Sequence, residues 1–318
     1  MSVYIKKASM VEKTVKNKKN VILSRMYKHR AMYFMILPAI IFYVIFSYVP
    51  MYGLTIAFKD FYSKRGILGS PWVGLYNFRQ IFTDPYFWQV LKNTLIINVM
   101  KLGFAFPAPI ILTLMFNEVR SKRFSKTIQT IVYLPHFISW VVISGIIFSL
   151  LSGDGLINSI LIAMGRTKID FLTNKELFRP LLVISEIWKE TGWDTIVYLA
   201  AITGISPELY EAAKIDGANR LRQLLNITIP CLLPTVSVML ILKTGGLMNG
   251  GFDQVFNLYN PIVYPVGDVI DTYVYRLGIG QSEYSLSTAV GLFLSISNFI
   301  MLVSVNFITK KISGNGIY

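Results

Sequence analysis

The feature that most constrains this sequence is a succession of apolar stretches of about 20 residues or more, the length a helix needs to cross a bilayer. Only 15% of the 318 residues are charged, against about 25% in soluble domains, which argues against a soluble enzyme. We therefore expect an all-α integral membrane protein with six transmembrane helices. The predicted spans are residues 31–58, 86–116, 128–151, 180–203, 229–248 and 286–309.

The distribution of basic residues predicts the orientation of these spans. Six spans place both termini on one side, and the segments on that side carry twice as many Lys and Arg residues as the opposite loops. The positive-inside rule then places both termini in the cytoplasm, with the chain in the cytoplasmic membrane. We expect residues 1–30 to form a basic cytoplasmic tail beside membrane lipid, 31–309 the transmembrane domain, and 310–318 a cytoplasmic tail. Binding of nucleic acid by the basic tail is the disfavoured alternative.

The sequence offers little for catalysis or metal binding. Cys231 is the only cysteine, so neither an internal disulfide nor a cysteine-cluster metal site can form. The two histidines, His29 and His136, are far apart in the sequence. We expect no catalytic residue and no metal site, and we expect His136 to be hydrogen-bonded within the helix bundle rather than to relay protons.

The connection between the fourth and fifth predicted spans, about residues 204–228, is patterned as two short helices. Ser206 can cap a helix whose first residue is Pro207, where a missing N–H costs nothing. Gly217 permits the reversal that ends it. One face of this helix is mostly small, and its members are Leu209, Ala212, Ala213 and Asp216. The face suits either close approach by another protein or a connector lying on the membrane surface.

This connection resembles the EAA loop of permease subunits in bacterial binding-protein-dependent ABC importers. That motif reads Glu-Ala-Ala, three residues, Gly, nine residues, Ile, one residue, Leu-Pro. The matching residues are Glu211, Ala212, Ala213, Gly217, Ile227, Ile229 and Pro230, with Ile229 in place of leucine. The extended form Glu-Ala-Ala-Lys-Ile-Asp-Gly-Ala is similar to the carbohydrate branch, which is maltose-importer-like, and later segments resemble its polysaccharide-type subgroup.

The resemblance implies a function and a set of partners. It implies that Glu211, Ala212, Ala213, Asp216 and Gly217 couple the chain to an ATPase subunit by docking in its cleft. The implied assembly contains a second homologous permease, two ATP-binding subunits and an extracytoplasmic solute-binding protein. The sequence holds no Gly-x-x-x-x-Gly-Lys-Ser/Thr phosphate loop. We therefore expect no cofactor on this chain, with ATP and Mg bound by the partner ATPase.

The fourth predicted span carries charged residues, which are costly inside a membrane and normally face protein or water. Glu186, Lys189, Glu190 and Asp194 lie close to one stripe with Trp193. We predict that Glu190, Trp193 and Asp194 form a hydrophilic wall of the solute path. Salt bridges within this helix, such as Glu186 with Lys189, are the equally weighted alternative.

The fifth predicted span ends in a glycine-rich segment, residues 244–252, which should break the helix and line a cavity. Asn249, Asp253 and Gln254 supply donors and acceptors that a sugar needs. The alternative is a flexible helix end that permits close packing. We expect the intramembrane residues Lys243 and Asn298 to hydrogen-bond between helices.

These observations favour the permease subunit of an ATP-driven importer for oligosaccharides or polysaccharide fragments. The alternative is an ion-driven secondary transporter or channel acting without an ATPase, which inverted repeats would favour. The subgroup resemblance points to complex saccharides, including uronate-bearing ones. The acidic stripe of the fourth span instead suits neutral solutes, so the two indications conflict.

Overall fold

The computed structural model describes residues 28–313 of the chain. The chain divides into two units at Thr55 and Ile56. The first unit contains α2 Arg30–Tyr43, η1 Val44–Tyr48 and α3 Val49–Met51, and the 3-10 segment η2 Tyr52–Phe58 crosses into the second. All side chains of α2, η1 and α3 are exposed in this single chain, as expected for a helix surrounded by lipid or partner subunits. The predicted basic tail lies almost wholly outside the described residues.

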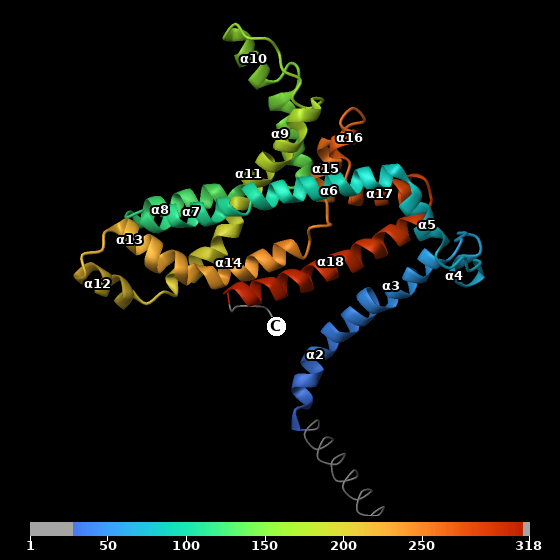
Figure 1. The fold of residues 1–318 in the computed structure, drawn as a ribbon, viewed down its shortest axis with the longest axis horizontal. Coiled ribbons are helices and arrows are strands. Elements are labelled where there is room, and N and C mark those ends of the chain that lie inside the picture. Colours follow the sequence, from blue (N-terminus) through green and yellow to red (C-terminus); the bar gives the residue numbers. More distant parts are fainter. Residues whose placement is uncertain (1–27, 314–318) are drawn as a thin grey trace, which may run out of the picture. The chain divides into compact units, whose positions relative to one another are not determined.

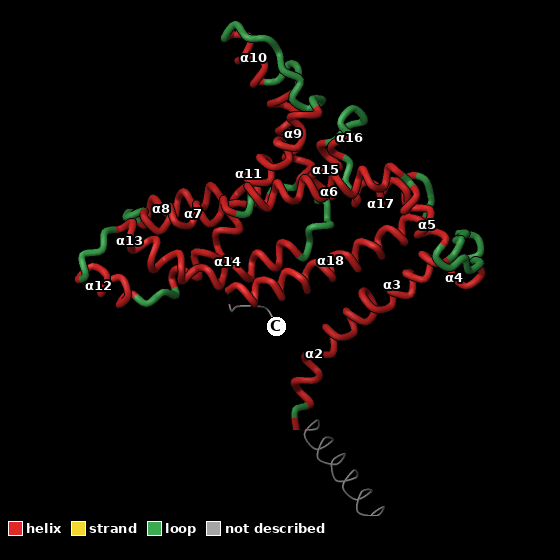
Figure 2. The backbone as a smooth tube through the Cα atoms, viewed as in Figure 1, coloured by secondary structure: helices red, strands yellow, loops and turns green. Residues whose placement is uncertain are grey.

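The regular secondary structure of the second unit is helical, with loops between the helices (Figures 1 and 2). Within residues 28–313, β pairing is limited to one isolated bridge between Lys59 and Trp72. The remaining elements are α4 Gly66–Gly69, α5 Tyr76–Thr83, α6 Pro85–Phe104, α7 Pro107–Glu118, α8 Lys122–Tyr133, η3 Leu134–Phe137, α9 Trp140–Leu151, α10 Leu156–Ala163, α11 Lys175–Thr203, α12 Pro207–Ile215, α13 Arg220–Gln223, η4 Leu224–Thr228, α14 Ile229–Thr244, α15 Phe252–Leu258, α16 Tyr264–Gly267, α17 Ile270–Tyr275, η5 Arg276–Gly280 and α18 Tyr284–Ser313.

Five helices among the described residues are long and apolar enough to cross a membrane. They are Arg30–Phe58, Pro85–Glu118, Trp140–Ala163, Arg220–Thr244 and Tyr284–Lys311. The expectation of an all-helical membrane protein is therefore confirmed. The remaining predicted span, residues 180–203, lies in α11, which has 29 residues but carries several charges along its middle. The six-crossing topology stays a prediction.

The third predicted span, residues 128–151, is wrong as a single helix. α8 ends at Tyr133, and Pro135 lies in the 3-10 turn that follows. Proline has no N–H to continue the helical ladder. Ile138 is extended, and Ser139 Oγ then caps α9 by accepting a hydrogen bond from Val142 N. The apolar helix long enough to cross is instead Trp140–Ala163, which is formed by α9 and α10.

Two other predicted spans differ in detail. The second, residues 86–116, is divided into α6 and α7 by a turn before Pro107. The fifth, residues 229–248, ends as an α-helix at Thr244, just before the first glycine of the glycine-rich segment. Both boundaries follow from residues that disfavour continued helix.

α11 is the central element of the second unit, where it packs against α6, α7, α8 and α14. Its contact with α8 is unusually close because Gly192 faces the backbone of Val132. A Cβ atom placed on Gly192 would lie 2.1 Å from the Val132 carbonyl oxygen. α14 packs along α18, and α9 packs against α15. This arrangement brings polar side chains of α6, α11 and α14 together.

Candidate functional site

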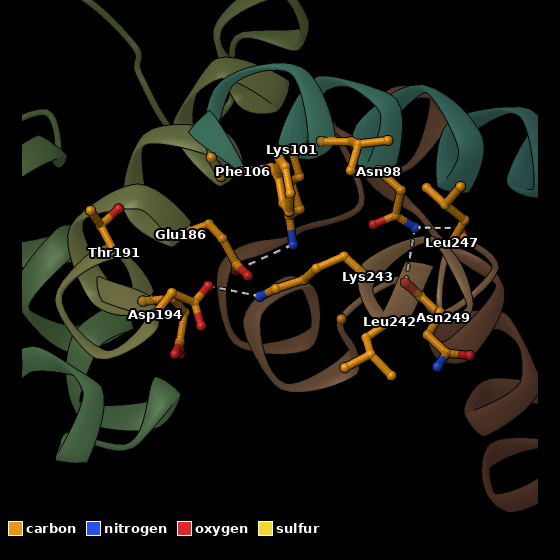
Figure 3. A pocket seen from close by; sticks show the side chains of 15 residues that line it. Asn98, Lys101, Phe106, Glu186, Thr191, Asp194, Leu242, Lys243, Leu247 and Asn249 are labelled. Atoms are coloured by element: carbon orange, nitrogen blue, oxygen red, sulfur yellow. Dashed lines mark hydrogen bonds and ion pairs between the residues drawn. The ribbon is translucent and has the colours of Figure 1, made fainter. Parts of the chain in front are cut away.

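A cavity of about 340 Å³ lies between α6, α11 and the end of α14 (Figure 3). Its wall combines carboxylates from α11 with lysines from the other two helices. The polar residues that line it are Asn98, Lys101, Glu186, Glu190, Thr191, Asp194, Lys243 and Asn249. Charged and polar side chains thus gather around this cavity, although much of its surface is apolar.

The glycine-rich segment forms one side of this cavity, and the predicted helix break is confirmed. Gly251 adopts a positive φ of 75°, which side-chain-bearing residues resist. The Nδ2 of Asn98 donates to the carbonyl oxygens of Leu247 at 2.7 Å and Asn249 at 2.9 Å. Asn298 Nδ2 donates to Asn249 Oδ1 at 2.9 Å, as expected for an interhelical contact. These bonds hold the broken segment in place.

Behind this segment, Asp271 accepts a hydrogen bond from the backbone N–H of Gly250 at 2.7 Å. Burial raises the pKa of the Asp271 carboxyl, and the backbone amides of Gly250 and Gly251 oppose this rise. The carboxyl group thus stabilises the turn that the glycines make possible.

Two lysines from different helices pair with the acidic face of α11. Lys243 Nζ lies 2.9 Å from Asp194 Oδ2, and Lys101 Nζ lies 3.4 Å from Glu186 Oε2. The alternative of salt bridges within α11 holds for Lys189 with Glu190 but not for Glu186 with Lys189, because Glu186 pairs with α6 instead. The interhelical role expected of Lys243 is confirmed. The charges of α11 are thus balanced by neighbouring helices.

Glu190, on the same face of α11, is held by two other groups. Its Oε1 lies 3.1 Å from Lys189 Nζ, and its Oε2 lies 2.6 Å from His136 Nδ1. The His136 ring stacks on Trp193, with centroids 4.4 Å apart and an interplanar angle of 3°. The expectation that His136 is hydrogen-bonded within the bundle is confirmed.

The predicted path residues fall into three places. Glu190, Asp194 and Asn249 line the first cavity. Asp253 lines a second cavity of about 440 Å³, which shares Glu190 with the first.

Trp193 lies against His136 rather than in either cavity lining. Gln254 is 1% exposed, and its amide donates to Leu182 O at 2.7 Å and to Ser185 Oγ at 2.9 Å. It therefore supports the cavity wall from behind.

Sequence reasoning missed Lys101. It lies on α6 within an apolar helix, and its Nζ also donates to Gln254 Oε1 at 2.6 Å. A charged residue inside an apolar span is by itself an indication of function, and this signal was available in the sequence. Its partners were not, because they lie on helices distant in the chain.

The loop between α11 and α14 has the predicted local structure. Ser206 Oγ accepts a hydrogen bond from Glu208 N at 3.3 Å, and Pro207 begins α12. Gly217 has a φ of 75°, and Ala218 N bonds back to Ala213 O at 2.8 Å, which closes the reversal. The capping and the turn are therefore confirmed.

The motif side chains of this loop lie at the surface of the single chain. Glu211, Ala212, Asp216 and Gly217 are exposed, and Ala213 is half-buried. Nearby apolar groups are also exposed, including Ile215 at 88%. The loop thus presents small and apolar groups outward.

The same loop is tied to the helices beside it. Arg220 Nη1 lies 2.9 Å from Glu118 Oε2 at the end of α7. Tyr210 Oη lies 2.9 Å from Thr228 Oγ1, at the start of the long helix Arg220–Thr244. The loop is therefore joined to the helix that carries Lys243.

Comparisons with known proteins agree with this architecture. The polygalacturonan/rhamnogalacturonan transport system permease protein YteP of Bacillus subtilis (strain 168) is 47% identical over 304 residues, which cover 95% of each chain. Protein LplB of the same organism is 42% identical over 297 residues, which cover 93% of each chain.

Two solved structures match with a TM-score of 0.86, and each match covers 92% of this chain and 99% of the other. One is a crystal structure of a bacterial ABC transporter involved in the import of the acidic polysaccharide alginate, at 42% identity. The other is a bacterial alginate ABC transporter in complex with its alginate pentasaccharide-bound periplasmic protein, at 41% identity.

The family model described as the binding-protein-dependent transport system inner membrane component matches residues 105–314. This region contains the loop and most of the cavity lining. The chain therefore belongs to this family of ABC transporter permeases, whose members are transport components rather than enzymes.

Proposed function

We propose that this chain is a permease subunit through which oligosaccharides from acidic, uronate-containing polysaccharides cross the cytoplasmic membrane. The observation that carries the proposal is the cavity of about 340 Å³ between mainly apolar helices, whose lining includes five charged and three polar side chains. Amide groups and hydroxyls there suit sugar hydroxyls, and the lysines suit carboxylates. The printed substrates of the relatives, polygalacturonan and alginate, support this class of solute.

ATP hydrolysis by a partner subunit drives this transport. The exposed face around Glu211, Ala212 and Gly217 docks in the ATPase, and its movement opens the path alternately to the two sides. The full sequence lacks a phosphate-binding loop, which supports ATP binding elsewhere. The remaining partners are a second homologous permease, a second ATPase subunit and a solute-binding protein. The alginate complex with a periplasmic protein supports the last of these.

The membrane topology of the working subunit has six crossings, with α11 as the charged one. Its charges face the cavity and neighbouring helices, which is how charged residues are accommodated at membrane depth. Both termini and the coupling loop then lie in the cytoplasm. The basic residues on that side support this orientation.

The coupling role is tested by Gly217→Val in the reconstituted complex with its binding protein. A Cβ on Gly217 would meet no atom within 4 Å, so the variant should insert and assemble. The valine disfavours the positive φ and adds bulk at the docking face. We expect uptake of trigalacturonate to fall strongly while ATP hydrolysis becomes uncoupled from it.

A matched control is Gly165→Val. Gly165 has a φ of 74° and likewise no atom within 4 Å of a Cβ, but it lies in the loop after α10. The substitution Gly165→Val imposes the same backbone strain as Gly217→Val, and we expect it to leave uptake near the wild-type level. Uptake at that level by the Gly217 variant would refute the docking role. Uptake by this chain alone, without an ATPase, would instead support an ion-driven transporter or channel.

A further inference from the structure

We propose that Lys101 and Lys243 form a carboxylate-binding site that Glu186 and Asp194 occupy when no saccharide is present. The carboxylates of an acidic oligosaccharide would displace these two side chains and pair with the lysines as the solute passes. This inference rests on the proposed function and adds to it the groups that recognise the negative charge.

The two ammonium groups come from different helices and are directed at the same face of α11 (Figure 3). Lys101 lies on α6 and Lys243 in the last turn of α14, and both line the cavity. Their partners on α11 are two turns apart, at Glu186 and Asp194. An acidic chain in the cavity would therefore meet two cationic groups supplied by separate walls.

The ion pair between Lys101 and Glu186 is long, which favours replacement of the Glu186 carboxylate by a saccharide carboxylate. Its Nζ lies 3.4 Å from Glu186 Oε2, beyond the usual length of a charge-assisted hydrogen bond. Its short bond, at 2.6 Å, is to the neutral amide oxygen of Gln254. Gln254 is in turn fixed by the bonds that its amide donates to α11. Lys101 therefore keeps its position when Glu186 moves away.

The space around Lys101 depends on a glycine. A Cβ on Gly251 would lie 3.2 Å from Lys101 Nζ, closer than an ordinary van der Waals contact. Because Gly251 has no side chain, space remains beside the cavity for the Lys101 ammonium group. The positive φ of the same glycine sets the turn that brings it there.

The charge balance of the cavity suits a substrate that carries its own carboxylates. Glu190 also lines the cavity, but Lys189 and His136 hold its two oxygens. The remaining lining charges are two lysines and two carboxylates. Replacing a protein carboxylate by a saccharide carboxylate keeps each lysine paired. This matters most for Lys101, whose side chain is only 13% exposed, because an unpaired buried charge is costly. The Lys243 side chain is 44% exposed and depends less on its partner.

The displaced carboxylates have access to water. The side chains of Glu186 and Asp194 are 24% and 19% exposed, so neither is sealed in place. Thr191 also lines the cavity, and its buried Oγ1 has no hydrogen-bond partner among the described residues. This hydroxyl oxygen is enclosed by neighbouring atoms, so a saccharide would reach it only after side chains around it moved. A neutral saccharide would have to compete with intact ion pairs and gain nothing from the lysines.

The test is trigalacturonate uptake by the complete complex in proteoliposomes, at varied concentrations of loaded binding protein. We expect Lys101→Met and Lys243→Met each to raise the half-saturating concentration by about tenfold or more. Glu186→Gln and Asp194→Asn remove the competing carboxylates and should leave that concentration unchanged or lower it. Lys→Arg at either position keeps the charge and should restore most of the uptake.

The opposite effects of the lysine and carboxylate variants distinguish binding from structure. If the ion pairs only stabilise the fold, removal of either partner should impair uptake equally, and that result would overturn the proposal. Wild-type kinetics from the lysine variants would also overturn it. If the methionine variants do not assemble, Glu186→Gln and Asp194→Asn test the proposal on their own. A raised half-saturating concentration in these variants refutes the proposal. An unchanged or lowered half-saturating concentration supports it.

Lys92→Met is the matched control, because Lys92 is an exposed lysine on the same helix α6 and does not line the cavity. It should transport as the wild type does. If the wild-type complex and this control take up no saccharide, the proposed function itself fails. If the wild type, the Lys92→Met control and the variants of Lys101 and Lys243 all transport normally, the proposed carboxylate site is refuted and the proposed function stands.

Discussion

The closest contact of α11 offers a demanding test of the packing, through the substitution Gly192→Ala. A Cβ on Gly192 would lie 2.1 Å from the carbonyl oxygen of Val132 and 2.6 Å from its carbonyl carbon. Ordinary contacts between heavy atoms begin near 3.5 Å. The obstructing atoms belong to the backbone of α8, so no side-chain rotation can relieve the clash. α8 and α11 must move apart by about 1 Å or more.

The size of the effect follows from two opposing contributions. Overpacking of this kind costs about 1–3 kcal/mol, and the backbone clash places Gly192→Ala in the upper part of that range. Alanine regains about 1 kcal/mol in helix propensity over glycine. Gly291, inside α18, has no atom within 4 Å of a Cβ, so Gly291→Ala gains the propensity without the clash. The two variants should therefore differ by roughly 2–3 kcal/mol.

The assay heats the purified complex and measures by size-exclusion chromatography the fraction that still elutes as the intact complex. The midpoint is the temperature at which this fraction falls to one half. We expect the midpoint of the Gly192→Ala complex to lie several degrees below that of the wild type. The midpoint of the Gly291→Ala complex should equal or exceed the wild-type value. Uptake should fall only in the first variant, because Asp194 lies two residues after the displaced glycine and contacts Lys243. Equal midpoints for the two alanine variants would refute the close α8–α11 packing.

Two further predictions concern buried polar groups outside the cavity. Asn158→Ala should destabilise the segment after α9 by about 1–3 kcal/mol, because the buried amide bonds to Ser152 O and to both backbone groups of Ile169. Limited proteolysis of the complex should detect faster cleavage there, and an unchanged rate would contradict the assignment. Arg276→Met should cost about 3–5 kcal/mol, because it removes the positive partner of the Asp268 carboxylate, which is fully buried and lies 2.5 Å from the guanidinium. The hydroxyl groups of Tyr86 and Thr272 still donate to this carboxylate but do not balance its charge. The thermal midpoint should recover in part when Asp268→Asn is added, and no recovery would argue against the ion pair as the cause.

Local features of the fold were predictable because the residues involved act on their own backbone. The cap at Ser206 and the reversal at Gly217 require only short-range geometry, and both are found. The helix break after Thr244 likewise follows from consecutive glycines. The broken third span was missed because averaged hydropathy is high on both sides of Pro135 and conceals the turn between them.

The partners of the charged residues were not predictable, since they depend on how helices pack. Periodicity places Glu186 and Asp194 near one stripe of α11, but it cannot say which helix faces that stripe. Lys101 stands 85 residues before Glu186, so their contact arises only from the packing of α6 on α11. Lys189 is closer to Glu186 in the sequence and lies on the same helix, but its ammonium group contacts the His136 carbonyl oxygen and the Glu190 carboxylate instead.

The long helix from Arg220 to Thr244 joins α13, the π-helical segment η4 and α14, and its length has a mechanical consequence. At 1.5 Å per residue it is a rod of about 36 Å, with the EAA turn at one end and Lys243 at the other. A tilt of about 5° at the loop end displaces the far end by roughly 3 Å over that length. That displacement equals the 2.9 Å separation of Lys243 and Asp194. A modest tilt at the loop end is thus large enough to open or close this ion pair.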